Sequence, residues 1–305
     1  MDILLYTPKE FPQWRDALAA ELPKARIHAW PGAPACDYAV LWKPPSALFA
    51  DHPELKAIFS LGAGVNGLLA TPGFPTGTPL VRMEDSGMAE QMVEYALYTA
   101  LREYRRFREY DGDQREARWN PHGLRQRSDF RIGVLGLGVL GASVASGLAE
   151  FGFTVSGWSR TEKRLPGIDC HHGDTGLAHV LAHSQQVIAL LPLTPATTGL
   201  LDAERLAQLP QGATLVNLAR GELIDDTALL AALDSGQLAH AYLDVFATEP
   251  LPAQHRYWNH ARVSITPHVA ALTPYAEAAR QVAGKIRRLE NGEHISGIVE
   301  IARGY

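Results

Sequence analysis

The sequence has very few cysteines and no long apolar run. Cys36 and Cys170 are the only two cysteines among 305 residues. That is too few for a disulfide framework and fits a protein of the reducing cytoplasm. No stretch approaches the roughly 18 consecutive apolar residues of a membrane-spanning helix. The N-terminus, MDILLYTPKE, lacks the basic segment of a signal peptide and has the pattern of a first core strand.

Positive charge is not in excess either. Lys and Arg number 28 against 33 Asp and Glu, which gives a formal net charge of −5. This balance gives no electrostatic reason to expect a nucleic acid or an anionic membrane as a partner. The apolar fraction of 46% and the charged fraction of 20% are those of an ordinary globular protein, and the length favours two domains.

The sequence does contain a strand, a glycine turn, a helix and a second strand in succession. Residues 132–135 are a short apolar run, and residues 139–151 have helical periodicity. Between and within them lie Gly136, Gly138 and Gly141 in G-x-G-x-x-G spacing. In this context the spacing is typical of a dinucleotide site, where the glycines allow a tight turn, approach of a pyrophosphate and close helix packing. The alternative is a glycine-rich turn that binds nothing.

A carboxylate is missing where an NAD site usually has one. Such sites place Asp or Glu about twenty residues after the glycines, on the ribose 2′-OH. Here the second strand ends at Ser159 and Arg160, and no carboxylate precedes Glu162. Ser159 can bond a 2′-phosphate, and Arg160, with Arg164 or Lys163 nearby, can pair with its charge. The sequence therefore favours NADP(H) over NAD(H), the alternative being a solvated basic loop.

Strands and helices alternate along the chain, which predicts parallel α/β layers. The predicted strands are residues 2–7, 26–30, 38–42, 57–60, 132–135, 153–158, 186–191, 214–218, 240–245 and 263–266. The predicted helices are residues 11–22, 86–108, 139–151, 176–183, 203–209, 225–235 and 274–290. Residues 102–131 are dense in charge and contain Trp119, so they form either a solvated face or an arm that packs on a partner subunit.

Three predicted strand ends in the second half of the chain lead to polar side chains. They lead to Arg220, to Asp244 and Glu249, and to His268. Because the carboxyl ends of parallel strands converge on a ligand crevice, these groups are expected to meet beside a nicotinamide. Arg220 offers a fork to a carboxylate or carbonyl oxygen, His268 is a proton donor, and Glu249 would favour the charged imidazole. Asp244 is expected to bond the nicotinamide carboxamide or ribose, although each residue taken singly also has a structural explanation.

The motifs around these residues resemble those of the D-isomer-specific 2-hydroxyacid dehydrogenases. The matching segments are Leu191-Pro192-Leu193-Thr194-Pro195-x-Thr197-x-Gly199, Asn217-x-x-Arg220-Gly221, Leu243-Asp244-Val245-Phe246-x-x-Glu249-Pro250 and Thr266-Pro267-His268-Val269-Ala270. Further segments resemble family members that reduce glyoxylate and hydroxypyruvate: Trp42-Lys43-Pro44-Pro45, Leu61-Gly62-Ala63-Gly64-Val65, Glu84-Asp85-Ser86-Gly87-Met88, Trp158-Ser159-Arg160 and Ala302-Arg303-Gly304-Tyr305. Gly157 and Asn66 stand where those members commonly have Cys and Asp, which weakens a statement about the exact substrate but not about the chemistry.

The resemblance implies roles for individual residues. The implied catalytic triad is Arg220, Glu249 and His268. The implied cofactor contacts are Gly136, Gly138, Val139, Leu140, Gly141, Trp158, Ser159, Arg160, Arg164, Leu191, Pro192, Thr197, Leu218, Ala219 and Asp244. The implied substrate contacts are the backbone N–H groups of Gly62, Ala63 and Gly64, together with Trp42, Arg220 and His268. Trp42 would shape the pocket for the C3 substituent.

The resemblance also implies the architecture. It predicts two doubly wound parallel-sheet α/β domains, with a Rossmann-type dinucleotide domain inserted into a smaller, flavodoxin-like substrate domain. The dinucleotide domain would be residues 98–273, and the substrate domain residues 1–97 plus 274–305. The C-terminal segment fits this arrangement because it is too short to bury a core of its own. A homodimer would be built on the dinucleotide domain and residues 102–131.

The function implied by the resemblance is the NADPH-dependent reduction of short 2-keto acids. Glyoxylate would give glycolate and hydroxypyruvate would give D-glycerate, with His268 as the general acid. One alternative is a D-2-hydroxyacid dehydrogenase for another 2-keto acid. The other is a catalytically idle binding protein that senses NADP(H).

A second group of residues has the side chains of a metal site. Its members are Cys170, His171, His172, Asp174, His179 and His183. His179 and His183 are four residues apart on a predicted helix, a spacing that suits zinc. The group lies in a helical region after the predicted NADP loop and away from strand ends. We therefore expect surface histidines here and no metal site.

Overall fold

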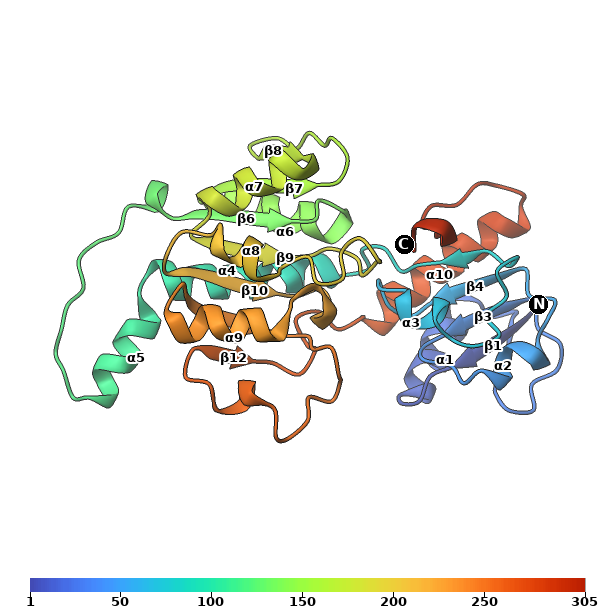
Figure 1. The fold of residues 1–305 in the computed structure, drawn as a ribbon. Coiled ribbons are helices and arrows are strands. Elements are labelled where there is room, and N and C mark those ends of the chain that lie inside the picture. The colour runs from blue at the N-terminus through green and yellow to red at the C-terminus, as the bar shows by residue number, and fades with distance from the viewer. Residues whose placement is uncertain (305) are drawn as a thin grey trace. The chain divides into compact units, whose positions relative to one another are not determined.

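The computed structural model describes residues 1–304, so Tyr305 of the C-terminal motif lies outside the described residues. The chain forms two compact units (Figure 1). Unit 1 comprises Met1–Met88 and Thr273–Tyr305, and unit 2 comprises Ala89–Leu272. Unit 2 is therefore inserted into unit 1, and the first division falls between Met88 and Ala89, at the start of helix α4, Met88–Tyr104. Among the described residues, no helix is both long enough and apolar enough to span a membrane.

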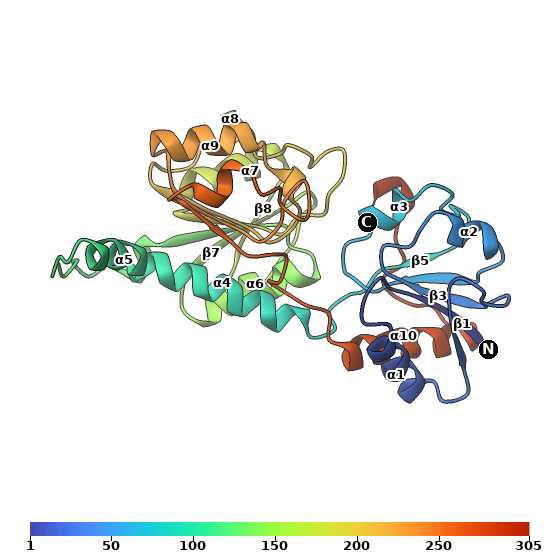
Figure 2. The same cartoon turned by 90° about the horizontal axis from the view of Figure 1, so that it is seen from below.

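Unit 1 is built on a five-stranded parallel sheet. Its strands are β1 (Asp2–Tyr6), β2 (Arg26–Ala29), β3 (Tyr38–Leu41), β4 (Ala57–Ser60) and β5 (Leu80–Val81). Their order, β2-β1-β3-β4-β5, is that of flavodoxin-like folds. The helices are α1 (Phe11–Glu21), α2 (Ala47–Asp51), α3 (Asn66–Leu69) and α10 (Tyr275–Glu290). Figure 2 shows α1 and α10 on one face of the sheet and α2 and α3 on the other.

Unit 2 is built on a seven-stranded parallel sheet. Its strands are β6 (Arg131–Leu135), β7 (Thr154–Ser159), β8 (Asp169–His172), β9 (Gln186–Ala189), β10 (Ala213–Asn217), β11 (Leu238–Leu243) and β12 (Val263–Ile265). The order β12-β11-β10-β9-β6-β7-β8 contains the Rossmann order with one added strand. The helices are α4, α5 (Phe107–Arg115), α6 (Val139–Glu150), α7 (Gly173–His183), α8 (Ala203–Ala207) and α9 (Asp226–Ser235). The prediction of two doubly wound α/β domains is confirmed.

The central strands of unit 2 are buried on both faces. Val187 and Ala189 of β9 belong to the core cluster that includes residues of α7, α8 and α9. Ile188, between them, belongs to the cluster that includes residues of α4 and α6. Figure 2 shows these two sets of helices on opposite faces of the sheet. Because successive residues of a strand point to opposite faces, a doubly covered strand reads as a continuous apolar run, and this made β6, β9 and β10 recognisable in the sequence.

The secondary structure differs from the prediction in several places, and the short elements β5, α2 and α3 were not predicted. The single helix predicted over residues 86–108 is divided, because Arg106 adopts a left-handed conformation (φ 59°) between α4 and α5. Strand β8 was not predicted, and it carries Cys170, His171 and His172, which were assigned to a helical region away from strand ends. Its sequence, DCHH, lacks an apolar run because β8 is an edge strand. Short 3-10 helices occupy Arg127–Asp129, Gly221–Leu223, Arg256–Asn259 and Ile301–Arg303.

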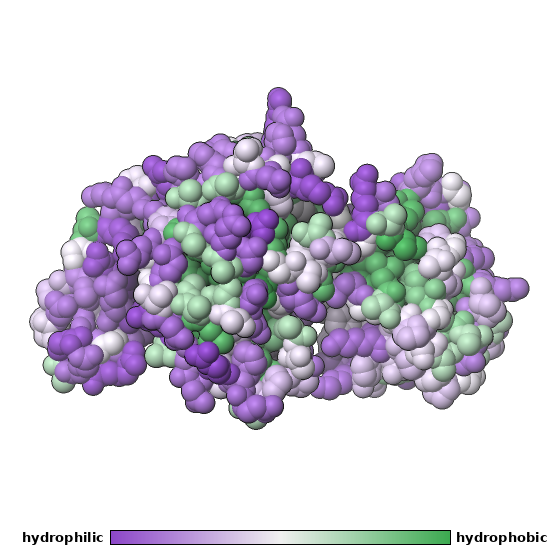
Figure 3. Space-filling view, viewed as in Figure 1, coloured by the Kyte–Doolittle hydropathy of each residue, from purple (hydrophilic) through white to green (hydrophobic). Residues whose placement is uncertain are grey.

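Residues 102–131, which we call the arm, comprise the last turn of α4, helix α5 and an extended stretch that leads to β6. Figure 1 shows α5 and this stretch standing out from the body of unit 2. The surface of α5 that is visible in Figure 3 is largely hydrophilic, in keeping with its sequence FREYDGDQR. Trp119 and Leu124, on the extended stretch, are 99% and 85% exposed.

Candidate active site

The glycine turn after β6 has the close packing expected of a dinucleotide site. Gly136 has φ +105°, and its N–H donates to the Trp158 carbonyl oxygen at 2.8 Å. A Cβ on Gly141 would lie 1.8 Å from the Gly136 carbonyl oxygen, so the start of α6 can pack here only without a side chain. A Cβ on Gly138 would meet nothing within 4 Å, which leaves space for a ligand to approach the backbone. β6 lies between β7 and β9, the point of the sheet where the strand order reverses and where such folds bind ligands.

Helix α6 begins directly after this turn. Its N-cap residue is Gly138, which has no side chain to satisfy the first N–H groups of the helix. Val139 is 44% exposed and begins the helix, and Leu140 follows it. An uncapped helix N-terminus carries partial positive charge and is suited to a phosphate. The turn and helix therefore fit the pyrophosphate of a dinucleotide.

The end of β7 is fixed by side-chain hydrogen bonds. Trp158 is buried and donates from Nε1 to the Gly173 carbonyl oxygen at 2.8 Å. Ser159 is also buried, and its hydroxyl donates to the Thr161 carbonyl oxygen at 2.7 Å. The hydroxyl proton of Ser159 is therefore used to shape the turn after β7. Arg160 is exposed at this turn and brings a cation to the position where the sequence predicted one.

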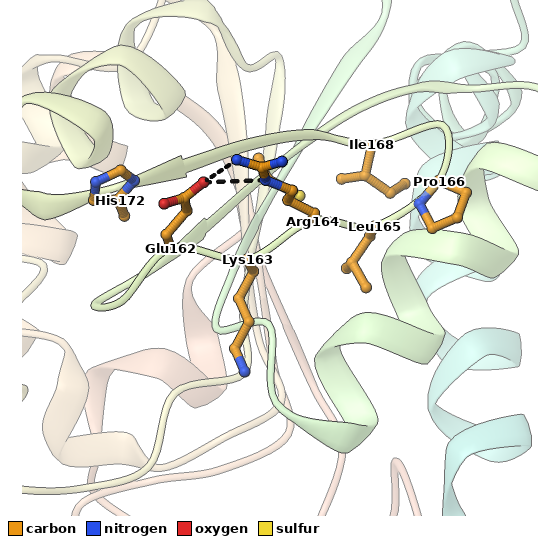
Figure 4. A pocket seen from close by; sticks show the side chains of 8 residues that line it. Glu162, Lys163, Arg164, Leu165, Pro166, Ile168 and His172 are labelled. Carbon is orange, nitrogen blue, oxygen red and sulfur yellow. Dashed lines mark hydrogen bonds and ion pairs between the residues drawn. The ribbon is translucent and has the colours of Figure 1, made fainter.

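The connection from β7 to β8 surrounds a pocket of about 500 Å³ (Figure 4). Its lining residues are Glu162, Lys163, Arg164, Leu165, Pro166, Ile168, Cys170 and His172. The Arg164 guanidinium forms an exposed ion pair with Glu162 at 3.0 Å, and Figure 4 shows the Lys163 side chain extending away from this pair. The charge of Arg164 is therefore already partly satisfied by Glu162.

The loop after β9 is held together by Thr197. Its hydroxyl donates to the Pro192 carbonyl oxygen at 2.7 Å and accepts from the Thr194 N–H at 2.8 Å. Leu191 is buried in the core at the base of the loop. These contacts give the predicted cofactor loop a defined shape at the carboxyl end of a central strand. The Thr197 hydroxyl has this internal role whether or not a ligand binds.

Arg220 is positioned by a tight loop after β10. The buried Asn217 side chain donates to the Arg220 carbonyl oxygen at 2.9 Å and accepts from the Ala219 N–H at 3.1 Å. A Cβ on Gly221 would lie 2.0 Å from the Ala247 nitrogen, so Gly221 allows this loop to press against the segment that follows β11. Burial lowers the pKa of Arg220, and the nearby Glu249 and Glu222 carboxylates oppose this shift. The guanidinium is a cation at any physiological pH. Leu218 and Ala219, beside it, are both buried.

His268 and Glu249 form a direct pair. His268 Nδ1 lies 2.8 Å and 3.0 Å from the two carboxylate oxygens of Glu249. Because a carboxylate only accepts hydrogen bonds, Nδ1 carries a hydrogen and Nε2 is the ring atom that can give or take a proton. Glu249 is fixed in turn by the Phe246 N–H, which donates to it at 3.1 Å. The predicted triad members therefore come together at the carboxyl ends of β10, β11 and β12.

Asp244 organises the loop that carries His268. Its carboxylate, 1% exposed, accepts from the Thr266 hydroxyl at 2.6 Å and from the N–H groups of Val269 and Ala270 at 2.9 Å each. Its carbonyl oxygen accepts from the His268 N–H at 2.8 Å. The sequence predicted only a contact with nicotinamide or ribose. The carboxylate therefore accepts three hydrogen bonds from the segment that carries His268.

Unit 1 contains the residues predicted to bind substrate. A Cβ on Gly62 would lie 2.5 Å from the Trp42 ring, so the glycine loop after β4 packs directly against that indole. The Gly62 N–H donates to the Ser60 hydroxyl at 3.2 Å within unit 1. Ala63 and Gly64 follow on the same loop. Their N–H groups are the better candidates for an anion.

Sequence reasoning missed three residues that position others. Asn217 and Thr266 are the first residues of two of the recognised motifs. The side chain of each hydrogen-bonds in a way that fixes the loop that follows it. Tyr95 of α4 lies 2.8 Å from the Thr266 hydroxyl oxygen. Because the single Thr266 hydroxyl proton is donated to Asp244, the Tyr95 hydroxyl donates to Thr266. Nothing in the sequence near Tyr95 signals this contact, which joins segments 171 residues apart.

Comparisons with known proteins agree with this geometry. Residues 97–270 match the family model described as D-isomer specific 2-hydroxyacid dehydrogenase, NAD binding domain. A protein of Serratia proteamaculans named glyoxylate/hydroxypyruvate reductase A is 47% identical, with 100% of each chain covered. A protein of Yersinia enterocolitica with the same name is 45% identical, again over 100% of each chain.

Solved structures show the same similarity. A D-isomer specific 2-hydroxyacid dehydrogenase from Xanthobacter autotrophicus, in complex with NADPH and MES, has a TM-score of 0.96 at 42% identity, covering 100% of this chain and 99% of that one. An NADPH-dependent glyoxylate/hydroxypyruvate reductase from Sinorhizobium meliloti, in complex with NADP and sulfate, has a TM-score of 0.93 at 33% identity with the same coverage. The chain belongs to the D-isomer specific 2-hydroxyacid dehydrogenase family.

Proposed function

We propose that this protein reduces short 2-keto acids, glyoxylate to glycolate and hydroxypyruvate to D-glycerate, with NADPH. The observation that carries the proposal is the His268–Glu249 pair. His268 Nδ1 lies 2.8 Å from a Glu249 carboxylate oxygen, Nε2 is available, and the pair lies at the carboxyl ends of the strands, as Arg220 does. The names and complexes of the Serratia, Yersinia and Sinorhizobium relatives support the substrate class and the cofactor.

The chemistry divides between the cofactor and the chain. When bound, the dihydronicotinamide supplies the hydride. The glycine turn and the N-terminus of α6 bind its pyrophosphate, with the Thr197 loop and residues 218–219 alongside. Arg220 binds the substrate carboxylate or carbonyl oxygen and favours the negative charge that develops on that oxygen. His268 donates its Nε2 proton to this oxygen, and Glu249 orients the ring through Nδ1.

We propose that the backbone N–H groups of Ala63 and Gly64 bind the substrate carboxylate and that Trp42 limits the size of the C3 substituent. The packing of Trp42 on Gly62 supports this, because it fixes the indole against the loop. A glycine loop of this kind recognises an anion through backbone donors.

NADP(H) is the proposed cofactor in preference to NAD(H). Arg160 is exposed at the end of β7, and no carboxylate occupies the position that would bind a ribose 2′-OH. Arg164, which lines the pocket between β7 and β8, is proposed as a further contact. A 2′-phosphate is a strong acceptor that a guanidinium can bind through two parallel hydrogen bonds.

We further propose a homodimer that forms through unit 2 and the arm. Within the arm, buried Asp113 pairs with Arg118 at 3.0 Å and with His122 at 2.8 Å. Several apolar side chains of the arm face solvent. Those of Tyr98, at its base, and of Phe107, Tyr110, Trp119 and Leu124 are all exposed. A concentration of exposed aromatic residues on a projecting segment is typical of a protein–protein interface.

The two free cysteines support a cytoplasmic location.

The test is a spectrophotometric panel of glyoxylate, hydroxypyruvate, pyruvate and phenylpyruvate, each measured with NADPH and with NADH. We expect the highest kcat/KM for glyoxylate or hydroxypyruvate with NADPH. A preference for pyruvate or phenylpyruvate would keep the reaction class and overturn the substrate. Tight NADPH binding without reduction of any of the four acids would overturn the proposed reaction.

A further inference from the structure

A group of three side chains at the outer edge of unit 2 has no part in the proposed reaction. Asp169 and His171 lie two residues apart on β8 and so share one face of that strand, and His179 lies on α7. β8 is one edge of the seven-stranded sheet, and β12, which leads to His268, is the other. The three potential ligand atoms, a carboxylate oxygen and two ring nitrogens, all lie within 4.8 Å of one another.

The backbone holds the two histidines together. A Cβ on Gly176 would lie 3.1 Å from His171 Cβ, so this glycine allows α7 to lie close to β8. The His171 and His179 rings are stacked with centroids 4.3 Å apart, and His183 stacks on the other side of His179 at 4.3 Å. The ring of His183 is turned back to its own helix, with Nδ1 2.8 Å from the His179 carbonyl oxygen. The arrangement depends on a strand and a helix, not on a mobile loop.

The ring nitrogens are in a state suited to ligation. His171 Nε2 is buried and lies 2.9 Å from Asp169 Oδ2, yet the angles do not make a hydrogen bond. A buried ring nitrogen that makes no hydrogen bond to the carboxylate beside it leaves its lone pair or proton unsatisfied. His179, the other histidine of the group, is exposed, and neutral imidazole is the form of histidine that binds metals.

We propose that Asp169, His171 and His179 bind a divalent transition-metal ion, with Zn²⁺ as the ion of best fit. Two imidazoles and one carboxylate form a ligand set that zinc accepts, with water in the remaining position. Bonds of about 2.0–2.1 Å in a tetrahedron place ligand atoms about 3.3 Å apart. Asp169 and His179 are both exposed, so small side-chain rotations bring the set to that spacing. The ion satisfies His171 Nε2 and ties the edge strand β8 to α7.

Binding of Zn²⁺ to the full-length, tag-free and metal-stripped protein tests the proposal by isothermal titration calorimetry. Co²⁺ absorption in the visible range reports the coordination geometry. The test variants are His179→Gln and Asp169→Asn, both at exposed positions. The control is His172→Gln, because His172 lies next to His171 on β8 but points to the opposite face of the strand.

We expect one Zn²⁺ per chain at this site, an affinity at least about tenfold weaker in both test variants, and no change in the control. None of the variants changes His268 or Glu249, so an ion bound at that pair would contribute equally to all of them and would not alter the differences in affinity. Zn²⁺ should also raise the Tm of the wild type and of His172→Gln, but not of His179→Gln. Equal binding by all four proteins, or an equal loss in His172→Gln, would overturn the proposal.

Discussion

At the residue scale, His268 has one ring nitrogen engaged by Glu249 and one available for proton transfer. Its backbone is left-handed (φ 56°), a conformation that Asn tolerates better than most residues. His268→Asn therefore removes the proton donor with little added backbone strain. We expect kcat/KM for glyoxylate to fall by about 10²–10⁴-fold, with NADPH binding, measured by fluorescence titration, unchanged. A variant that keeps the wild-type rate would show that the proton comes from another group.

Cofactor choice is also decided by single side chains. Arg160→Ala removes the exposed cation at the end of β7, and Arg164→Ala removes an exposed cation farther along the connection to β8. Hydrogen bonds to charged groups contribute about 1.5–3 kcal/mol, so we expect the KM for NADPH to rise about 10- to 100-fold in Arg160→Ala. The rise in Arg164→Ala should be smaller. The KM for NADH serves as the control in both variants, and an equal rise for the two cofactors would contradict the assignment of Arg160 to the 2′-phosphate.

The sequence predicted the residues of the triad but not what holds them. The triad residues could be predicted because each follows a strand, and the carboxyl ends of parallel strands lie on the same side of the sheet. The contribution of Asp244 to the His268 loop could not be predicted, because its partners are backbone N–H groups of residues 25 and 26 positions away. The engaged Gly62 N–H was missed for a similar reason, since it depends on the conformation of the loop that brings it to Ser60.

At the element scale, α4 and the loop after β12 are joined through Tyr95, Thr266 and Asp244. Thr266→Val keeps the shape of the side chain and removes its hydrogen bonds, which leaves a buried carboxylate with one donor fewer. We expect kcat to fall about tenfold, because a small displacement of His268 is costly to catalysis, while the KM for NADPH stays near the wild-type value. Thr266→Ser, which retains the hydroxyl, should restore kcat. A loss in Thr266→Ser as large as in Thr266→Val would mean that the hydroxyl does not position His268.

Elements were predictable where burial imposes a pattern. The central strands of unit 2 are covered on both faces, and their continuous apolar runs identified them as strands. β8 pairs on one side only and has the sequence DCHH, so no such pattern was available. The end of α4 was missed because Arg105 and Arg106 are ordinary helix formers, and the left-handed conformation of Arg106 comes from the turn into α5.

At the scale of the whole molecule, the chain divides into two units, and the sequences of α10 and α4 differ in how clearly they indicate this division. The last helix, α10, buries Ala278, Ala279, Val282, Ala283 and Ile286, so the C-terminal segment completes a core that begins at residue 1. The amphipathic pattern of α10 carries that information. α4 has apolar residues that pack in the core of unit 2, including Ala96 and Ala100, and its uninterrupted helical pattern gives no sign of where one unit ends.

The assembly is the last property that the sequence left open, between a solvated face and an arm for a partner subunit. Trp119 is 99% exposed, so replacing it removes almost no contact within the chain. If the arm packs on a second copy, the double variant Trp119→Arg, Leu124→Arg places two buried, unpaired charges in the interface, which is strongly destabilising. We therefore expect the wild type to sediment at twice the 33.3 kDa of the chain and the variant to sediment as a monomer with its fold intact by circular dichroism.

A matched control distinguishes the arm from exposed aromatic residues in general. Trp258 also lies in unit 2 and is 49% exposed, but it belongs to a 3-10 helix outside the arm. Trp258→Arg should leave the dimer unchanged, because an exposed Trp that is not part of an interface can be replaced by a charge at little cost to assembly. If Trp258→Arg dissociates the protein and the arm variant does not, the interface lies elsewhere on unit 2. A wild type that is monomeric at all concentrations would make the arm a solvated face, with its ion pairs of Asp113 serving only to hold its own conformation.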